Sequence, residues 1–514
     1  MRDSRSRHLF FSLTLLVFMG LSVDSPTPAR AESPDASEKS EKSSPAPPIR
    51  AESAPSKPAP ADAVEKLRDE INGILQNRVS SKAKVGIAAV DMTTGQVLYE
   101  RNADEGFNPA SNMKLLTSAA ALDAWGPAYT FETKLYGRAA KNGVIPGPLF
   151  VKGEGDAFLL FEDFISWAGQ LKLKGIERIE GGIVIDDSIF DGSYLPPGFG
   201  QKDEDASYRS PIGAVTVNFN AVTVIATPAS QAGSRPETRM YPPNEYVTID
   251  NRAKTVSGYG RRLTFKSEPD GDGGTKIIVE GKIGKGASEM RSRLRIDHPP
   301  GFAGSVLEKV LGMVGISVDG PIRTGKVNGD LKAIVSHRSQ PLSYIVLAMN
   351  KWSNNFMAEQ LLRTLGAKNG EASTWEASRK QLHAFLEKAG LQTDAIKLKN
   401  GSGLYDGNEV PPREFVRLLT YMRDHSAGPE FVSSLAVAGR DGTLKDRMEG
   451  SQTAGNVRGK TGTLNKVSAL SGYVTTRSGR PVAFSVILND TPRRAWRYRP
   501  AQDAIVEALA EFDE

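Results

Sequence analysis

Three short patterns in the sequence combine residue types that can carry out acyl transfer. The first is Ser111-Asn112-Met113-Lys114, whose serine and lysine, three positions apart, share one face of a helix. A serine hydroxyl is a weak nucleophile and needs a neighbouring base. Lys114 can be that base if burial or nearby positive charge lowers its pKa. The string alone is weak evidence, since a second S-x-x-K, Ser81-Lys82-Ala83-Lys84, precedes a predicted strand.

The second pattern is Ser353-Asn354-Asn355, at the start of a helical run. Its serine can relay a proton to a leaving group, and the Asn355 amide can hold a substrate carbonyl. The alternative is an ordinary helix N-cap, because serine and asparagine both cap helices well.

The third pattern is Lys460-Thr461-Gly462-Thr463, on a predicted strand. Lys460 offers positive charge and Thr461 a hydroxyl to a substrate carboxylate. Gly462 leaves room for a ligand to lie against the strand edge. The same residues can also form a turn.

Hydrophobic periodicity predicts the elements that must position these residues. Ser111 stands at the start of a predicted buried helix, where the helix dipole favours a developing negative charge. We expect helices over 64–75, 113–125, 302–314, 345–350, 356–364, 376–389, 412–425 and 500–512. We expect strands over 85–91, 96–101, 182–186, 215–226, 276–279, 469–475 and 482–488.

The order of these elements predicts a nested domain organisation. Short β-like stretches broken by Gly, Pro and Asp separate two halves of a helix-and-sheet unit, which indicates an insertion. We therefore expect a first part over 61–135, inserted β-rich domains over 136–335 and a second part over 336–514.

The N-terminal residues predict export. A basic start, a short apolar run and Ala29-Arg30-Ala31 are typical of a signal peptide over 1–31, with a retained membrane anchor as the alternative. Residues 32–60 are rich in Pro, Ala, Ser, Glu and Lys, and we expect a disordered linker there.

Composition narrows the classes of function. Hydrophobic residues make up 39% and charged residues 24%, as in soluble globular proteins. The net charge of +5, part of it in the signal segment, is too small to indicate a nucleic-acid partner. With no cysteine and five scattered histidines, the chain has neither disulfides nor a recognisable metal pattern, and we expect no metal or cofactor.

In their order along the chain, the three patterns resemble the signature of penicillin-binding proteins and serine β-lactamases. The chain is most similar in its motifs to the low-molecular-mass class C penicillin-binding proteins. These form the D-alanyl-D-alanine carboxypeptidase/endopeptidase family (peptidase family S13, penicillin-binding protein 4 type). The similar segments are Phe107–Ser111, Asn400–Leu404, Ala438–Leu444 and Gly459–Leu464. The resemblance implies an α/β (α+β) architecture, a penicillin-binding/β-lactamase-like transpeptidase fold interrupted by a long β-rich nested insertion.

The resemblance also implies roles for the site residues. Ser111 would attack the penultimate D-Ala carbonyl with Lys114 as base, and Ser353 with Lys114 or Lys460 would protonate the leaving amine. The remaining groups would bind the substrate: Asn355, Lys460, Thr461, Gly462 and Thr463, with the amides of Ser111 and Thr463 as an oxyanion hole. The family's aspartate for the substrate side chain matches Asp203, with Asp205 as fallback and surface acidity as the alternative.

The implied protein is an exported, periplasmic serine D-Ala-D-Ala carboxypeptidase, DD-endopeptidase or both. Its partners would be peptidoglycan peptides and β-lactams, with no membrane span after signal cleavage. Two alternatives share the fold: a β-lactamase, for which no deacylating base can be assigned, and a non-catalytic wall-binding protein. A Ser-His-Asp hydrolase is disfavoured because there is no G-x-S-x-G elbow.

Overall fold

A six-stranded antiparallel sheet unites segments from the first and last thirds of the chain. The computed structural model describes residues 57–202, 204–271, 273–329, 331–367, 372–450 and 452–513. The strand order of this sheet is β18-β19-β20-β21-β1-β2. Its strands are β1 (Lys84–Asp91), β2 (Val97–Arg101), β18 (Ala436–Val437), β19 (Arg458–Leu464), β20 (Val467–Thr475) and β21 (Pro481–Asn489).

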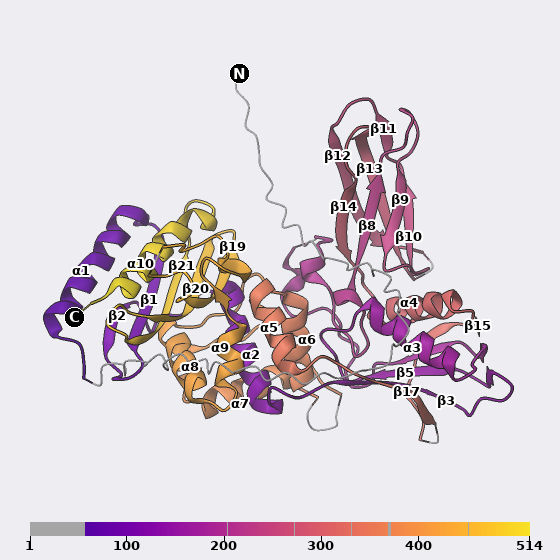
Figure 1. Ribbon diagram of the computed structural model, residues 1–514, viewed down its shortest axis with the longest axis horizontal. Coiled ribbons are helices and arrows are strands. Elements are labelled where there is room, and N and C mark those ends of the chain that lie inside the picture. The colour runs from indigo at the N-terminus through magenta and orange to yellow at the C-terminus, as the bar shows by residue number, and fades with distance from the viewer. Residues whose placement is uncertain are drawn as a thin grey trace, which may run out of the picture. The chain divides into compact units, whose positions relative to one another are not determined.

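Alternating side chains give this sheet two apolar faces. On β21, Val482, Phe484 and Val486 belong to a core with α1 (Ala61–Arg78) and α10 (Arg499–Glu511). Ala483 and Ile487 of the same strand belong to the core of the opposite face. Figure 1 shows α1 and α10 side by side along the sheet.

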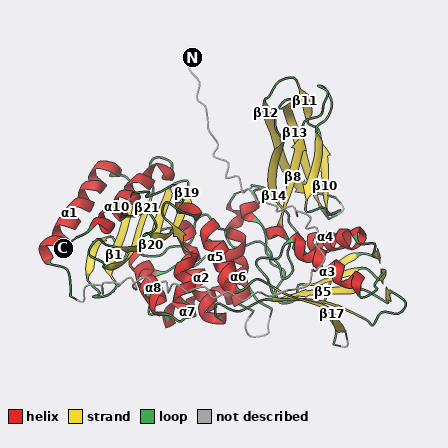
Figure 2. Ribbon diagram, in the orientation of Figure 1, coloured by secondary structure: helices red, strands yellow, loops and turns green. Residues whose placement is uncertain are grey.

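The opposite face of the sheet carries a group of helices around α2 (Met113–Trp125) (Figure 2). Every residue of α2 from Met113 to Leu122 is buried, including the polar Lys114, Thr117 and Ser118, because other helices pack around it. Its neighbours are α5 (Leu342–Trp352), α6 (Asn355–Leu365), α7 (Trp375–Lys388), α8 (Pro412–Asp424) and α9 (Gly428–Ser434).

Between α2 and α5 the chain builds further sheets around a separate apolar core. A five-stranded sheet has the order β16-β7-β5-β3-β17 and packs against α3 (Phe161–Leu173) and α4 (Pro299–Met313). The other sheets are β15-β6-β4, β14-β8-β9 and β10-β13-β11, with β12 paired to β13. The strands are β3 (Glu132–Gly137), β4 (Val144–Ile145), β5 (Leu149–Gly153), β6 (Arg178–Glu180), β7 (Ile183–Asp186), β8 (Ala221–Thr227), β9 (Glu237–Tyr241), β10 (Val247–Asn251), β11 (Lys254–Val256), β12 (Arg261–Pro269), β13 (Thr275–Gly284), β14 (Met290–Arg295), β15 (Ser317–Asp319), β16 (Ile322–Thr324) and β17 (Lys332–Arg338).

The mixed α/β class and most predicted elements are confirmed, with two corrections. Helix α3 lies in a stretch for which the sequence predicted only one helix, over 302–314. Its buried residues follow helical spacing, and the Asp163 carboxylate accepts from the Leu160 amide at its start. The strand predicted over 215–226 is also wrong in part, because Asn218–Asn220 have positive φ and the strand begins only at Ala221.

The predicted signal peptide over 1–31 and most of the linker over 32–60 lie outside the described residues. Residues 57–60 are described and contact the sheet, because the Ala59 amide donates to Gln96 Oε1 at 2.7 Å. Along the described chain, no helix combines the length and apolar character that crossing a membrane requires. The described residues belong to a single compact unit, so the limits at 135/136 and 335/336 stay predictions.

Candidate active site

Ser111 lies on a tight turn that leads into α2. The turn is the 3₁₀ segment Ala110–Asn112, and Ala110 has a φ of 46°, a strained value for a residue with a side chain. Asn108 Oδ1 accepts from the Ala110 amide at 3.0 Å and so supports this conformation. The Ser111 side chain is thereby presented at the N-terminal end of α2, partly exposed.

Lys114 is completely buried directly below Ser111. Its Nζ lies 3.0 Å from Ser111 Oγ, 2.7 Å from Asn355 Oδ1 and 2.8 Å from the Ser402 carbonyl oxygen. Burial and the positive charge of Lys460 hold the pKa of Lys114 well below its ordinary value, while Glu359 acts in the opposite direction. The lysine is therefore poised to exist as the neutral amine that a general base requires.

The three residues of the pattern Ser353-Asn354-Asn355 have different partners in the structure. Ser353 ends α5 with a φ of 55°, and its Oγ lies 2.9 Å from Lys460 Nζ. Asn354 is the helix cap, because its side chain accepts from the Met357 amide at 3.0 Å. Asn355 faces Lys114, and its Nδ2 donates to the Tyr208 carbonyl at 3.1 Å. The amide group expected to hold a substrate carbonyl thus has protein partners on both sides in this structure.

The Lys460 pattern lies on strand β19, as predicted. Lys460 is completely buried, and burial lowers its pKa to about 7. Thr461 Oγ1 lies 2.8 Å from Thr443 Oγ1, and Arg499 reaches Thr463 Oγ1 at 3.4 Å. The edge of β19 beside Lys460 is open, because β18 pairs only with Arg458 and Gly459 and no other described strand follows it there.

Gly462 has a different reason to be glycine from the one the sequence suggested. A Cβ atom at this position would lie 2.6 Å from the Pro109 carbonyl oxygen and 3.1 Å from Ala110 Cβ. The missing side chain therefore lets β19 pack against the turn that carries Ser111. The space that was predicted for a ligand is occupied by this neighbouring backbone.

Three groups at the site were not predicted from the sequence: Glu359, the Ser402 carbonyl and the Thr443 hydroxyl. Glu359 follows Asn355 by four positions and so shares its helix face, which was an available signal. Ser402 lies in the segment Asn400–Leu404 that resembled the family, but backbone carbonyl contacts leave no mark on residue type.

Asp203, the predicted contact for a substrate side chain, lies outside the described residues. Its neighbour Glu204 is described and accepts from the hydroxyls of Tyr208 and Tyr405. The fallback Asp205 accepts from the Ser267 amide at 2.9 Å, so its carboxylate is engaged in joining β12 to the rest of the insertion.

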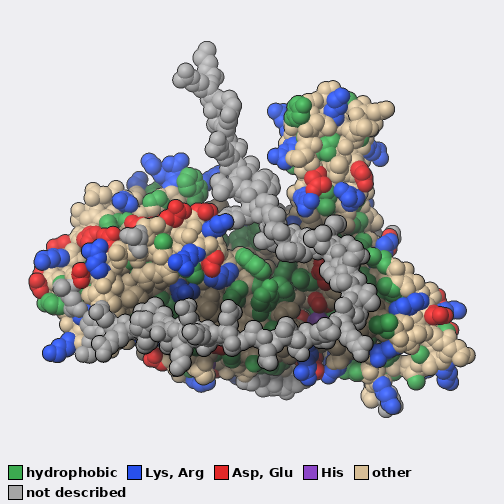
Figure 3. Space-filling model, viewed as in Figure 1, with side chains coloured by type: hydrophobic (Ala, Val, Ile, Leu, Met, Phe, Trp, Pro, Cys, Tyr) green, Lys and Arg blue, Asp and Glu red, His purple; other side chains and the backbone are tan. Residues whose placement is uncertain are grey.

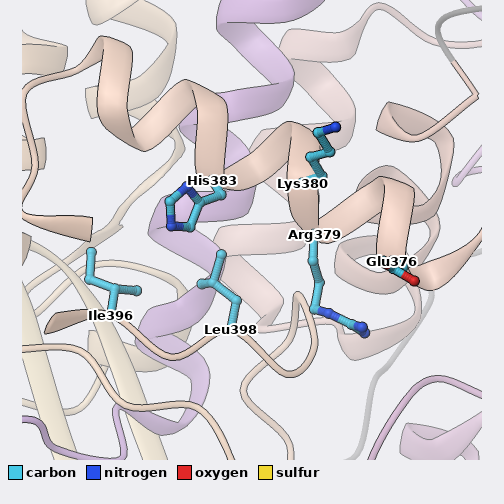
Figure 4. Close-up of a pocket in the computed structure, with 6 residues that line it drawn as sticks. All are labelled: Glu376, Arg379, Lys380, His383, Ile396 and Leu398. Carbon is cyan, nitrogen blue, oxygen red and sulfur yellow. The ribbon is translucent and has the colours of Figure 1, made fainter. Parts of the chain in front are cut away.

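Other candidate features lie apart from these three motifs. In the Ser81 pattern, Lys84 pairs with Glu105 and both Ser81 and Lys84 are exposed. An open pocket of about 390 Å³ lies between α7 and residues 396–398 (Figure 4). It is lined by Glu376, Arg379, Lys380, His383, Ile396 and Leu398. Among the described residues no group of three or more His, Cys, Asp or Glu side chains is arranged to hold a metal ion.

Exposed aromatic side chains border the motif residues. Trp352 directly precedes Ser353 and is 50% exposed, and Tyr344 of the same helix is 43% exposed. Figure 3 shows hydrophobic side chains gathered over α5 and α6 on this face. Tyr208, whose carbonyl accepts from Asn355, is 46% exposed.

Comparison with known proteins identifies the relatives of this chain. The family model of the D-Ala-D-Ala carboxypeptidase 3 (S13) family matches residues 67–512. A D-alanyl-D-alanine carboxypeptidase of Actinomadura sp. (strain R39) is 33% identical over 475 residues, covering 88% of this chain and 87% of the relative. D-alanyl-D-alanine carboxypeptidase DacB of Haemophilus influenzae is 24% identical over 428 residues, covering 81% of this chain and 87% of the relative.

A solved structure shares the fold. The crystal structure of penicillin binding protein 4 (dacB) from Haemophilus influenzae matches with a TM-score of 0.74 and 22% identity, covering 85% of this chain and 98% of that one. The same protein complexed with a β-lactam matches with a TM-score of 0.70 and 21% identity, over 85% and 98% of the two chains.

Proposed function

Because the chain belongs to the D-Ala-D-Ala carboxypeptidase 3 (S13) family, we propose that it cleaves its substrates through an acyl-enzyme on Ser111. It is a hydrolase, a D-Ala-D-Ala carboxypeptidase. The observation that carries the proposal is the buried Lys114 amine 3.0 Å from Ser111 Oγ.

Acylation begins when Ser111 Oγ attacks the carbonyl carbon of the penultimate D-Ala. The hydroxyl proton passes to the neutral Lys114 amine as the C–O bond forms. The amides of Ser111 and Thr463 stabilise the tetrahedral oxyanion, a contribution commonly worth about 3 kcal/mol. The C–N bond then breaks, and the leaving D-Ala nitrogen takes a proton through Ser353 and Lys114 or Lys460. Water hydrolyses the ester and restores Ser111.

Substrate recognition rests on β19. Its open edge beside Lys460 offers backbone groups to an extended peptide, as in β-strand addition. Lys460 and Thr461 bind the terminal carboxylate, and Asn355 orients the peptide after its Nδ2 leaves the Tyr208 carbonyl. Asp203 binds the amino end of the substrate's diamino-acid side chain, a role that the resemblance to the family implies.

The same machinery has wider consequences. A D-Ala-to-diamino-acid cross-link presents the same carbonyl, so the enzyme also acts as an endopeptidase on peptidoglycan. We also propose that β-lactams acylate Ser111 and leave slowly; the binding of a β-lactam is supported by the structure of Haemophilus influenzae penicillin binding protein 4 complexed with one. Residues 1–31 direct export to the periplasm, and domains within 136–335 are nested in a transpeptidase-like domain formed by 61–135 and 336–514.

Labelling with a fluorescent penicillin tests the proposal. Wild-type protein should be labelled covalently, Ser111→Ala should not, and the matched variant Ser81→Ala should be labelled like wild type. Labelling of Ser111→Ala, or none of wild type, would contradict it. Fast, repeated penicillin turnover would instead indicate a β-lactamase. Incubation with cross-linked and uncross-linked muropeptides then shows whether D-Ala is released, cross-links are cut, or both.

A further inference from the structure

Glu359 is a buried carboxylate that the proposed mechanism does not use. It lies on α6, one turn after Asn355, with no exposed surface. Its Oε1 accepts from the Ser402 amide at 2.7 Å, and its Oε2 accepts from the Gly401 amide at 3.1 Å. One carboxylate thus fixes two successive peptide units, since charge-assisted hydrogen bonds of this kind are short and strong.

The peptide units held by Glu359 form the floor below the nucleophile. The Ser402 carbonyl accepts from Lys114 Nζ at 2.8 Å, and the Gly401 carbonyl accepts from Thr117 Oγ1 at 2.8 Å. The next residue, Gly403, packs so closely that a Cβ there would lie 1.7 Å from the Ala110 carbonyl oxygen. A shift of this loop would therefore move the acceptor of Lys114 and the turn before Ser111 together.

Charge provides a second link between Glu359 and Lys114. The charged groups that act on Lys114 are Lys460 of β19, which lowers its pKa, and Glu359 of α6, which raises it. Burial raises the pKa of Glu359, whereas its amide donors, the Ser402 hydroxyl and Lys114 lower it. The carboxylate thus opposes the repulsion between two buried ammonium groups.

We infer that Glu359 is a positioning residue for acylation: it holds the Ser402 carbonyl against the Lys114 amine and sets the electrostatic potential at that amine. This inference rests on the proposed functions of Ser111 and Lys114. Glu359 does not touch the substrate in this scheme and acts only through Lys114.

The test compares Glu359→Gln with Glu414→Gln by the pH dependence of acylation with a chromogenic penicillin. Glu414 is another buried carboxylate, on α8, where it accepts from the Gln392 amide at 2.8 Å and pairs with Arg417. In Glu359→Gln, the amide NH₂ would face a backbone donor and the charge is lost. We expect acylation to slow about 10- to 100-fold. Its acid limb should move to lower pH by about one pH unit, because Lys114 loses a neighbouring anion.

Each outcome decides the inference. Glu414→Gln should keep both the wild-type rate and the wild-type limb. If Glu359→Gln matches Glu414→Gln in both the acylation rate and the position of the acid limb, the inference is overturned. Glu359→Asp keeps the charge but is too short to reach both amides, so it should slow acylation while leaving the limb in place. Should Glu359→Gln not fold, a wild-type rate in Glu359→Asp would overturn the inference and a reduced rate would support it. Absence of acylation in wild type would instead remove the proposed function.

Discussion

Lys114 and Lys460 are two completely buried lysines, and the charge of Lys460 lowers the pKa of Lys114. The two ammonium groups repel each other strongly, because both side chains are buried and buried surroundings have a low effective dielectric constant. At least one of them is therefore driven towards its neutral form, and the proposed mechanism needs that form at Lys114. In the proposed mechanism, Lys460 thus helps to make Lys114 a base.

Removing Lys460 should make Lys114 harder to deprotonate. In Lys460→Gln the repulsion is gone, the pKa of Lys114 rises, and the acid limb of penicillin acylation should move to higher pH. The control is Lys351→Gln, because Lys351 is neutralised by Asp441 at 2.7 Å and has no contact with Lys114 among the described interactions. An unchanged limb in Lys460→Gln would show that Lys114 does not sense this charge.

Binding of a substrate carboxylate should depend on the protonation of Lys460. Its pKa of about 7 means that it is charged below that pH and neutral above it. We expect KM for a D-Ala-D-Ala peptide to rise as pH increases through about 7, while a peptide ending in D-Ala amide shows no such rise. Equal pH dependence of KM for the two peptides would contradict the assignment of Lys460 to the carboxylate.

Gly403→Ala should disable the enzyme, whereas Gly95→Ala should only destabilise it. The two glycines have φ values of 77° and 73°, so an alanine at either costs about 1–2 kcal/mol of conformational strain. A Cβ at 95 meets open space, but at 403 it meets the Ala110 carbonyl at 1.7 Å. We expect penicillin labelling to fall about 100-fold or more in Gly403→Ala, since the turn at Ser111 must move. Urea unfolding of both variants measures the loss of stability, and fluorescent-penicillin labelling measures the loss of activity. Labelling of Gly403→Ala at the wild-type level would refute the prediction.

Buried ionisable groups should give the free energy of unfolding a minimum near neutral pH. Burial raises the pKa values of Asp156 and Asp187 to about 7, so the native state binds more protons than the unfolded state between about pH 4 and 7. Stability from these groups therefore falls as pH rises through that range. Lys460 has the opposite effect above about 7, where the unfolded state holds the proton that the native state has released.

Urea unfolding across this pH range measures that minimum. Asp156→Asn should make the acidic side shallower, because the amide has no proton to lose and only Asp187 still contributes. The exposed Asp69→Asn on α1 is the matched control and should leave the profile unchanged. A wild-type profile that does not fall between about pH 4 and 7 would contradict the prediction.

The sequence was sufficient to predict the parts of this site that depend on residue type. Ser111, Lys114, Ser353, Asn355 and Lys460 are brought together as expected, and the helix predicted over 113–125 has those bounds in the structure. The three patterns are short and each contains a reactive or charged group, so they can be recognised without knowledge of the fold.

What escaped prediction depends on packing between distant segments. The reason for glycine at 462 is the Pro109 carbonyl, far away in sequence, and the role of Ser402 lies in its backbone. Helix α3 was missed because the stretches around it, broken by Gly, Pro and Asp, suggested β structure, although its own apolar residues recur at helical spacing.

The C-terminal half of α6 contacts residues of the insertion. Arg363 is fully buried and pairs with Asp191 at 2.5 Å, while Gln360 accepts from the Gly213 amide at 3.3 Å. A shortened enzyme made by excising 136–335 would strand that guanidinium without its carboxylate, a loss of about 3–5 kcal/mol. Helix α6, which carries Asn355 and Glu359, would also lose the part of the insertion against which it packs. Miniaturisation of this enzyme must therefore redesign α6 before it removes the insertion.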